Sequence, residues 1–212
     1  MMEQYHKIKT VWERDPETNY KTLIHGKWAL PEFGFLQNNH WLFTEKVDGT
    51  NVRIIVEDGG IRFAGKSDAA VLPRPLLDSL RDTHLAFRDR FCDLFAGAPA
   101  YLYGEGYGAG IQKGGGLYRP DQGFVLFDVR VGEWWLRRSD VEDIAGELSL
   151  NVVPVIGAGT LNDMITHVID GFDSQWGRFR AEGIVARPAV ELFDRGGRRI
   201  ITKVKCKDFD QG

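Results

Sequence analysis

Residues 45–51 read EKVDGTN and place Lys46 two residues before an Asp-Gly turn, at the end of an expected strand. A lysine there lies exposed at the lip of a groove, where its amine, once it has lost a proton, is a nucleophile. The ordinary alternative is a solvated hairpin turn with a surface lysine. The string alone does not decide between the two, so the other residues able to handle phosphate, metal or nucleotide matter.

Two glutamates stand where an expected strand begins or ends. Glu105 lies among glycines in residues 103–106 (YGEG), so it can accept a hydrogen bond from a ribose hydroxyl or bind a metal while the backbone comes close. Glu182 directly precedes the apolar residues 183–186 (GIVA), a common way to present a carboxylate to magnesium. Taken alone, Glu105 is more typical of an ordinary surface turn.

An aromatic residue and a row of lysines complete the set. Phe127 lies in an apolar stretch, residues 124–128 (FVLFD), and can stack on a base, although a core position is the ordinary role of such a phenylalanine. Residues 203–207 (KVKCK) alternate, which sends Lys203, Lys205 and Lys207 to one face of a strand. A lysine row is typical of a solvated edge strand, but three ammonium groups on one face also suit a bound phosphate chain.

The distribution of charge supports a local rather than a global polyanion site. The formal net charge of the 212 residues is −3, so any polyanion must be met by a local basic patch. The stretch 187–207 is the one strongly basic segment, in which seven basic residues stand against Glu191 and Asp194. The seven are Arg187, Arg195, Arg198, Arg199, Lys203, Lys205 and Lys207.

The elements that must position these side chains are mainly strands. We expect a hairpin turn at Asp58-Gly59-Gly60. Strands are expected at 41–43, 52–56, 61–63, 101–103, 124–129, 183–186 and 199–207. Residues 1–40 are typical of short elements and loops.

Helices are expected at three places. One amphipathic helix runs through 77–94 and carries His84 as a packed residue at the edge of the core. A second covers 141–148 with Ser139 as its cap, and a third covers 161–169 and is stopped by Gly171. Strands outnumber helices and tight turns join them, which favours an α+β fold with mainly antiparallel sheets flanked by helices.

Composition excludes several classes of protein. Hydrophobic residues make up 43% and charged residues 27%, which is typical of a globular chain with a real core. Cys92 and Cys206 are too few for a disulfide framework or a zinc site and predict free thiols in a reducing compartment. The polar N-terminus is no signal peptide and no apolar run is long enough to cross a membrane, so we expect a cytoplasmic protein without a membrane partner.

These elements, in this order, resemble the motifs shared by ATP-dependent polynucleotide ligases and mRNA capping enzymes. The family pattern is Lys-x-Asp-Gly, an aromatic-Gly-Glu strand, an aromatic strand ending in Asp, Glu-Gly-hydrophobic, and Lys-x-Lys, and it covers residues 45–209. Asn51, the stretches 108–113 (GAGIQK) and 181–188 (AEGIVARP), the opening YHKIKT and Trp28 look most like RNA ligases of the phage and editing type. The resemblance implies the nucleotidyltransferase (ligase adenylation) fold.

The resemblance implies a role for each reactive residue. Lys46 carries AMP covalently, and Lys203 and Lys205 grip the α-phosphate of ATP. The gripping pair is alternatively Lys205 and Lys207, but with the former pair Phe209 falls at the aromatic position that follows in the family. Lys46 must lose its proton before it attacks, and Lys203, Lys205 and a bound Mg²⁺ are the cations that disfavour its charged form.

Other residues are implied to bind the nucleotide. Glu105 holds a ribose hydroxyl, Phe127 stacks on adenine, and Glu45 contributes to the adenine pocket, partly through its backbone. Asn51 helps to orient phosphate or the nicked end. Lys66 falls where the family usually has an arginine that touches phosphate, which keeps the charge but loses the two-pronged hydrogen bonding of a guanidinium.

The metal and nucleic-acid contacts follow the same resemblance. Glu182 binds Mg²⁺ (or Mn²⁺), and Arg187, Arg198, Arg199 and Lys207 contact the nucleic acid. The implied activity passes AMP from ATP to the 5′-phosphate of an RNA end, after which a 3′-hydroxyl displaces AMP and seals the strand. A DNA ligase, a GTP-dependent capping guanylyltransferase and a non-catalytic nucleotide- or RNA-binding module remain alternatives.

Phe209 closes the last motif shortly before the end of the sequence. We therefore expect one domain over residues 1–212, without a C-terminal accessory domain. Phosphate contacts dominate nucleic-acid affinity and weaken steeply as salt rises, so sealing is expected to be weak and salt-sensitive. An accessory protein or a homodimer is the expected source of extra grip on RNA.

Overall fold

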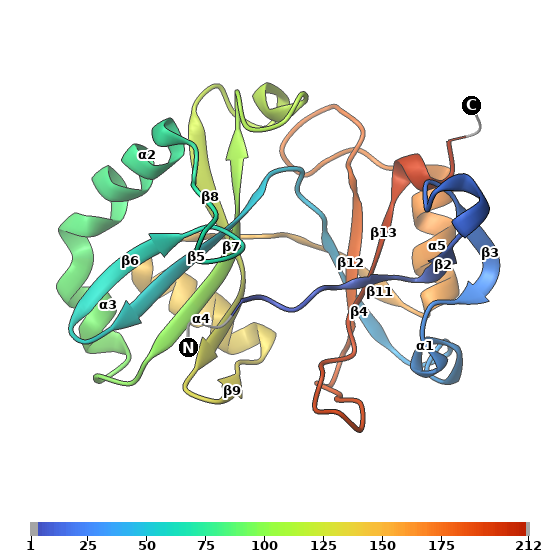
Figure 1. Ribbon diagram of the computed structural model, residues 1–212, viewed down its shortest axis with the longest axis horizontal. Helices are drawn as coiled ribbons and strands as arrows, with labels where there is room; N and C mark the ends of the chain where they lie inside the picture. The colour runs from blue at the N-terminus through green and yellow to red at the C-terminus, as the bar shows by residue number, and fades with distance from the viewer. Residues whose placement is uncertain (1–3, 211–212) are drawn as a thin grey trace. The chain divides into compact units, whose positions relative to one another are not determined.

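The structure is a computed structural model that describes residues 4–210, and its chain divides into two compact units (Figure 1). The first unit takes the residues up to Tyr5 and Asp48–Val153, and the second takes His6–Val47 and the residues from Pro154 onward. The first three and last two residues of the expected domain lie outside the described residues. That residues 1–212 act as one domain stays a prediction.

The first unit is built on a six-stranded sheet. Its order is β10 (Asn151–Val152), β8 (Gln122–Val131), β7 (Ala100–Gly108), β5 (Thr50–Glu57) and β6 (Gly60–Ala64), with β9 (Trp134–Trp135) paired to β8. Every pairing is antiparallel except that of β10 with β8. Asp58 and Gly59 both have positive φ, 51° and 67°, as expected for the predicted hairpin turn between β5 and β6.

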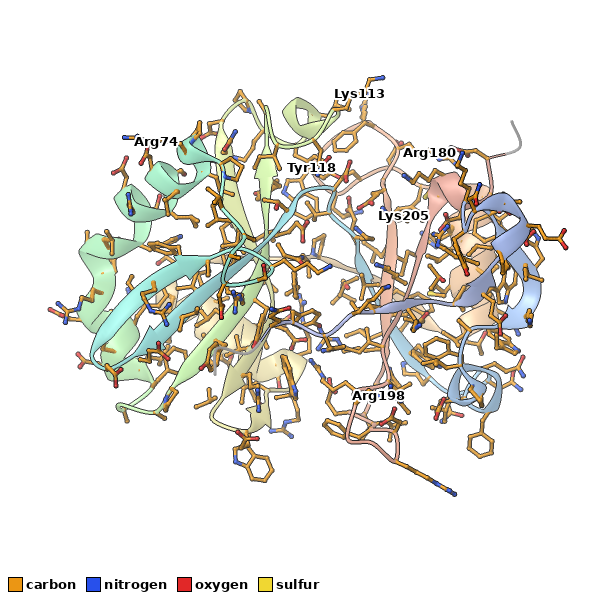
Figure 2. All side chains as sticks on the ribbon, viewed as in Figure 1. Arg74, Lys113, Tyr118, Arg180, Arg198 and Lys205 are labelled. Carbon is orange, nitrogen blue, oxygen red and sulfur yellow. The ribbon has the colours of Figure 1, made fainter. Side chains whose placement is uncertain are left out.

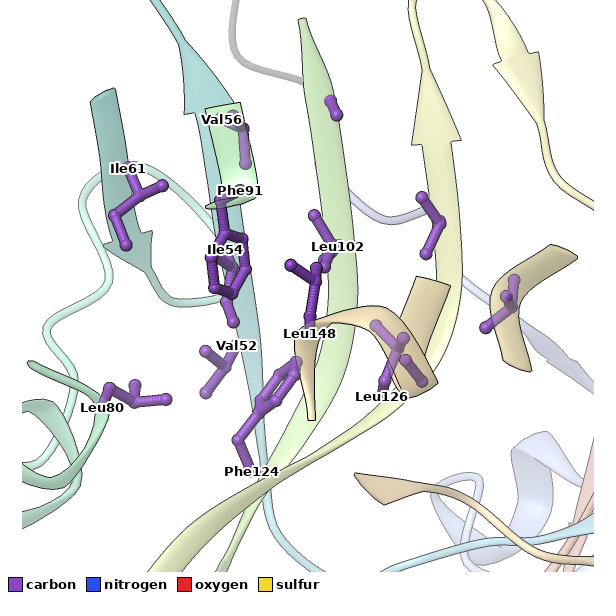
Figure 3. Close-up of a cluster of buried hydrophobic side chains, with 14 of the residues drawn as sticks. Val52, Ile54, Val56, Ile61, Leu80, Phe91, Leu102, Phe124, Leu126 and Leu148 are labelled. Atoms are coloured by element: carbon purple, nitrogen blue, oxygen red, sulfur yellow. The ribbon is translucent and has the colours of Figure 1, made fainter. Parts of the chain in front are cut away.

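One face of this sheet is covered by three helices, α2 (Arg74–His84), α3 (Arg88–Leu94) and α4 (Arg138–Leu148). Alternate residues of a strand point to the same face, so Val52, Ile54 and Val56 all enter this core. Figure 3 shows these side chains facing those of the helices. The intervening residues of β5 point to the opposite face, which these helices do not cover.

The single helix expected over 77–94 is wrong, because a 3₁₀ turn, η2 (Leu85–Phe87), separates α2 from α3. A 3₁₀ turn advances each residue by more than an α-helix does, so the apolar stripe changes direction there. Phe87 is consequently 53% exposed while Phe91 is fully buried. His84 packs against Phe91 with ring centroids 6.0 Å apart, as expected of a core-edge histidine, and burial lowers its pKa.

The helix expected over 141–148 begins earlier than predicted. It starts at Arg138, its N-cap residue is Arg137, and no side chain caps it. Ser139 therefore lies inside the first turn, where its hydroxyl donates to Asp140 at 3.2 Å. The capping prediction for Ser139 is wrong.

The second unit contains a five-stranded sheet in the order β1 (Lys9–Thr10), β13 (Thr202–Lys205), β12 (Gly183–Pro188), β4 (Trp41–Glu45) and β11 (Val155–Gly159). Only β1 with β13 is a parallel pair. A separate hairpin joins β2 (Trp12–Arg14) to β3 (Leu23–Trp28). The expected strand over 199–207 is shorter than predicted, because the chain turns into the 3₁₀ segment η4 (Cys206–Asp208).

Two α-helices belong to this unit, α1 (Pro31–Phe35) and α5 (Leu161–Asp170), with the 3₁₀ turn η1 (Pro16–Thr18); a further turn, η3 (Gly115–Leu117), lies in the first unit. The α5 helix follows the prediction: Thr160 and Asp163 form a reciprocal cap and Gly171 ends the helix. Its buried residues join those of β4, β12 and β13 in a second core.

Antiparallel sheets with packed helices make the fold α+β, as predicted. None of the helices in residues 4–210 combines the length and the apolar character needed to cross a membrane. Both cysteines are free thiols, as predicted, although Cys206 begins η4 rather than lying in a strand.

Phe91→Ala is expected to lower the free energy of unfolding by about 3–5 kcal/mol, because a large buried side chain leaves a cavity in the first core. The matched control is Phe87→Ala in the neighbouring 3₁₀ turn, expected to cost less than about 1 kcal/mol because its ring is half-exposed. Chemical denaturation measures both. Equal losses of unfolding free energy in the two variants would contradict the change in direction of the apolar stripe at η2.

Candidate functional site

Lys46, Glu182 and Lys205 meet at one end of the second-unit sheet. Strand β12 lies between β4 and β13, so Lys46 after β4 and Lys205 at the end of β13 flank Glu182, which precedes β12. The Lys46 N–H donates to the Gly183 carbonyl at 2.9 Å, and the Cys206 N–H donates to the Glu182 carbonyl at 2.9 Å. These two hydrogen bonds continue the sheet one residue beyond the ends of β4 and β13, so the backbone around Glu182 is held on both sides.

The Glu182 carboxylate bridges the two lysines. Its Oε2 lies 2.5 Å from Lys46 Nζ, and its Oε1 lies 2.6 Å from Lys205 Nζ. The outer strands are about 10 Å apart, twice the usual strand spacing, so a carboxylate on the middle strand is the group that reaches both. The Glu182 side chain is only 11% exposed, which shields both ion pairs from water.

Close backbone packing requires a glycine, Gly183, directly after Glu182. A Cβ on Gly183 would lie 2.1 Å from the Val204 carbonyl oxygen, which is backbone and cannot move aside. The glycine therefore allows β12 to approach β13 closely at the residue that follows the bridging Glu182. Any larger residue would separate Glu182 from Lys205.

The lysine row is only partly formed. Lys203 and Lys205 are half-buried on one face of β13 while Val204 between them enters the core, as the alternation predicts. Lys207 lies in η4 and not on the strand, so its placement on the same strand face is wrong. The structure favours Lys203 and Lys205 over Lys205 and Lys207 as neighbours on one face.

Glu45, the last residue of β4, is 1% exposed. Its Oε2 accepts a 2.8 Å hydrogen bond from the Gln175 N–H, and its own N–H donates to the Pro154 carbonyl. Burial raises the pKa of the Glu45 carboxyl above the ordinary 4.5, against the lowering effect of hydrogen bonds from Gln175 and Ser174. The side chain fixes residues 174–175, a role that sequence reasoning missed.

In the first unit, Asn51 and Glu105 face each other across β5 and β7. The Asn51 amide donates to Glu105 Oε2 at 3.0 Å, and both side chains lie on the sheet face opposite the helices. Gly49 packs directly beside them, since a Cβ there would lie 2.2 Å from the Gly106 carbonyl oxygen. The Asp-Gly and Gly-Glu-Gly motifs thus come together through a close backbone approach.

Phe127 lies at an irregularity where β8 shifts its register against β7. Its ring contacts Tyr5 edge-on, with centroids 5.0 Å apart, and Tyr5 also donates to Asp128 at 2.9 Å. Sequence reasoning did not place Tyr5 beside this strand. The sequence contained only a weak indication of this contact, namely the family resemblance of the opening residues YHKIKT.

Lys66 follows β6, and the residues around it are held by Arg53. The Arg53 side chain is 2% exposed, donates to the Gly65 carbonyl at 2.8 Å and pairs with Asp68 at 2.8 Å. It therefore holds the backbone of Gly65 before Lys66 and the side chain of Asp68 after it. Sequence reasoning missed Arg53, although an arginine inside the apolar run 52–56 was a signal that it needs a buried partner.

Three arginines of the basic segment 187–207 pair with the two acids of the same segment. Arg199 is buried and binds Glu191 through two nitrogens at 2.9 and 2.6 Å, and Arg187 is buried 3.6 Å from the same carboxylate. Arg198 pairs with Asp194 at 2.7 Å and projects from the loop before β13 (Figure 2). The guanidinium groups of Arg187 and Arg199 thus serve the fold, which does not fit the expected surface contact with nucleic acid.

Glu182 could hold a metal ion only as a single protein carboxylate, with the other ligands supplied by water and substrate. Within residues 4–210, no group of three or more His, Cys, Asp and Glu side chains is placed to hold a metal ion. Mg²⁺ usually keeps several waters and takes one or two carboxylates together with substrate phosphates. Glu182 beside two ammonium groups fits that mode of binding and does not fit an all-protein metal cage.

The α+β fold, with its two mainly antiparallel sheets and packed helices, is of the nucleotidyltransferase type. A family model described as RNA ligase matches residues 39–205. The chain therefore belongs to the RNA ligase family.

Solved structures of Naegleria gruberi RNA ligase share the fold. The form with PPi matches with a TM-score of 0.68 at 16% identity, over 96% of this chain and 56% of that one. A mutant form with AMP and Mn gives 0.67 at 15%, and another mutant form with ATP and Mn gives 0.67 at 16%, with the same coverage of 96% and 56%. The chain thus spans little more than half the length of these proteins.

Glu45→Gln is expected to remove a pH-dependent loss of stability. Between pH 4.5 and the raised pKa, the folded protein keeps a proton on Glu45 that the unfolded chain has released, so wild-type stability falls as pH rises through this window. The uncharged amide keeps an acceptor for the Gln175 N–H. Urea unfolding across this range compares wild type, Glu45→Gln and the exposed control Glu17→Gln; the same fall in Glu45→Gln would exclude Glu45 as its source.

Proposed function

We propose that the protein is an ATP-dependent RNA ligase that forms a covalent lysyl-AMP intermediate on Lys46. The observation that carries this proposal is the Lys46–Glu182–Lys205 arrangement in a chain of the RNA ligase family. Family membership favours this activity over a DNA ligase, a GTP-dependent capping enzyme or a non-catalytic binding module. The Naegleria structures with ATP, AMP and Mn give further support through their shared fold.

The proposed first step is a displacement at the α-phosphorus of ATP. The Lys46 amine gives up a proton and forms an N–P bond, the bond from phosphorus to the bridging oxygen breaks, and pyrophosphate leaves with the electron pair. Positioning and charge neutralisation supply most of the catalysis in such displacements. Lys203 and Lys205 neutralise the α-phosphate, and Lys205 lies one carboxylate away from the nucleophile.

Glu182 holds the nucleophile in place. At 2.5 Å its carboxylate attracts the ammonium form of Lys46, the form that cannot attack. The same contact provides the route by which the proton leaves Nζ. Glu182 would also hold a hydrated Mg²⁺ or Mn²⁺, which when bound neutralises phosphate charge.

The remaining roles follow the motifs. Glu105 holds a ribose hydroxyl and is oriented by Asn51, whose amide bonds to it at 3.0 Å. Phe127 stacks on adenine, Lys66 contacts phosphate from a backbone held by Arg53, and Glu45 contributes through its backbone because its side chain is engaged.

The second half of the proposed reaction transfers AMP to the 5′-phosphate of an RNA end, and a 3′-hydroxyl then displaces AMP. Arg198 and Lys207 are the residues of the basic segment proposed to contact RNA. Repair of RNA in the cytoplasm, with Mg²⁺ as the metal and an accessory protein or a second copy as partner, completes the proposal. The whole-protein activity is proposed, since the chain spans 56% of the Naegleria ligase.

Lys46→Ala is expected to abolish covalent labelling by α-labelled ATP. The variant lacks the proposed nucleophile, the amine that follows β4 and bonds to Glu182. The matched control is Lys27→Ala, whose side chain is 57% exposed and which is expected to label like wild type. Incubation with labelled ATP or GTP, followed by denaturing electrophoresis, measures the adduct. Label persisting in folded Lys46→Ala, or labelling by GTP alone, would exclude the proposal.

Glu182→Gln is expected to slow self-adenylylation by about 10²-fold or more, the size of effect seen when one charge-stabilising group is lost. The amide keeps the shape of the side chain but no longer attracts either ammonium group. Rates are measured across Mg²⁺ and Mn²⁺ titrations, with Glu32→Gln as the control and thermal unfolding to check the fold. A wild-type rate at every metal concentration would exclude both proposed roles of Glu182.

A further inference from the structure

We propose that a cavity in the second unit binds a short single-stranded segment of RNA beside the reacting end. The choice of RNA rests on the proposed function. The cavity has a volume of about 720 Å³, and its lining includes Lys7, Lys9, Arg14, Tyr20, Lys203 and Lys205. The acidic residue of the lining, Glu13, is paired with Lys27 at 2.6 Å.

Two lysines at the N-terminal side of this cavity are available to a ligand. Lys7 and Lys9 are exposed, and within the part of the chain that the structure describes neither forms an ion pair. Arg14 is instead tied to Asp208 by bonds of 2.9 and 3.1 Å. A groove lined by accessible lysines is what a nucleic-acid backbone requires.

Tyr20 adds a stacking surface to the lysines. Its side chain is 63% exposed, and its φ of 61° follows a φ of 54° at Asn19. A bulky residue rarely adopts a left-handed conformation, and such strain persists where the surroundings impose it and a function uses it. An exposed ring on a fixed backbone is suited to stacking on a base.

Arg14 and Asp15 both hold the backbone of Tyr20 in this conformation. The Arg14 Nη1 donates to the carbonyls of Tyr20 and Lys21 at 3.3 and 3.1 Å, while Nη2 is held by Asp208. The Tyr20 N–H also donates to the Asp15 carbonyl at 2.9 Å. The ring is therefore presented by a backbone fixed at both its N–H and its carbonyl.

Single-stranded RNA fits this cavity better than a free polyphosphate does. A polyphosphate would use the lysines but would leave the exposed tyrosine without a role. RNA uses both, with phosphates on Lys7 and Lys9 and a base on Tyr20. Lys205 lines the cavity and shares Glu182 with Lys46, so an RNA end bound there approaches the nucleophile.

Tyr20 variants test the stacking. Binding of a fluorescent single-stranded RNA with a 5′-phosphate is measured by anisotropy without ATP or metal. Tyr20→Gly is expected to weaken binding roughly 5- to 150-fold, the range for one stacked base, and to keep the fold because glycine adopts positive φ freely. Tyr20→Phe is expected to bind like wild type, as is Phe35→Ala, which removes an 86% exposed ring outside the cavity.

Lys7→Ala/Lys9→Ala tests the phosphate contacts. The slope of log affinity against log salt is expected to become less steep by about 0.7 for each single-strand phosphate that the variant no longer neutralises. Lys21→Ala removes an exposed charge that does not line the cavity and is expected to leave the slope unchanged. Labelling of Lys46 is assayed separately, so failure of the ligase proposal and failure of this one are distinguishable.

Wild-type affinity and slope in folded Tyr20→Gly and Lys7→Ala/Lys9→Ala would overturn the proposal. Absence of RNA binding by the wild type at low salt would also overturn it. If the lysine variant binds RNA normally but needs more ATP for self-adenylylation, the cavity takes polyphosphate and the RNA assignment is wrong.

Discussion

One carboxylate between two ammonium groups is the constraint on which the proposed chemistry depends. Glu182 bonds to Lys46 and Lys205 at the end of three adjacent strands, so the register of the sheet sets where the nucleophile stands. Two lysines this shielded would repel each other without the anion. The same attraction favours the unreactive ammonium, so the arrangement describes a resting state.

In each unit, the polar residues with proposed chemical roles lie on other positions than the apolar residues that form the core. Alternation along β5 sends Val52 and Ile54 into the helix-covered core and Asn51 to the other face. In β12 the core residues Ile184 and Ala186 begin just after Glu182. Substitution of the polar residues therefore leaves the cores intact. Arg53 and Glu45 are exceptions, because both are buried: Arg53 holds Gly65 and Asp68 on either side of Lys66, and Glu45 holds Gln175.

The strands and the motifs were predictable from sequence because both depend on local patterns. The hairpin at Asp58-Gly59, helix α5 and the shared face of Lys203 and Lys205 follow from turn residues, caps and alternation. The break at residues 85–87 was not predictable, since an apolar stripe continues through it. Pairing between distant residues was also hidden, and only the fold shows that Glu191 occupies Arg187 and Arg199 and that the opening lysines line a cavity with β13.

The close approach at Gly183 gives a criterion for judging related sequences. A search that requires the nucleophilic lysine and the acidic residue alone accepts chains in which alanine or serine follows the acid. Such chains carry the reactive groups, yet a Cβ there meets a backbone oxygen at 2.1 Å and forces β12 away from β13. A residue with no side chain is therefore as necessary to the Glu182–Lys205 ion pair as the two charged residues themselves.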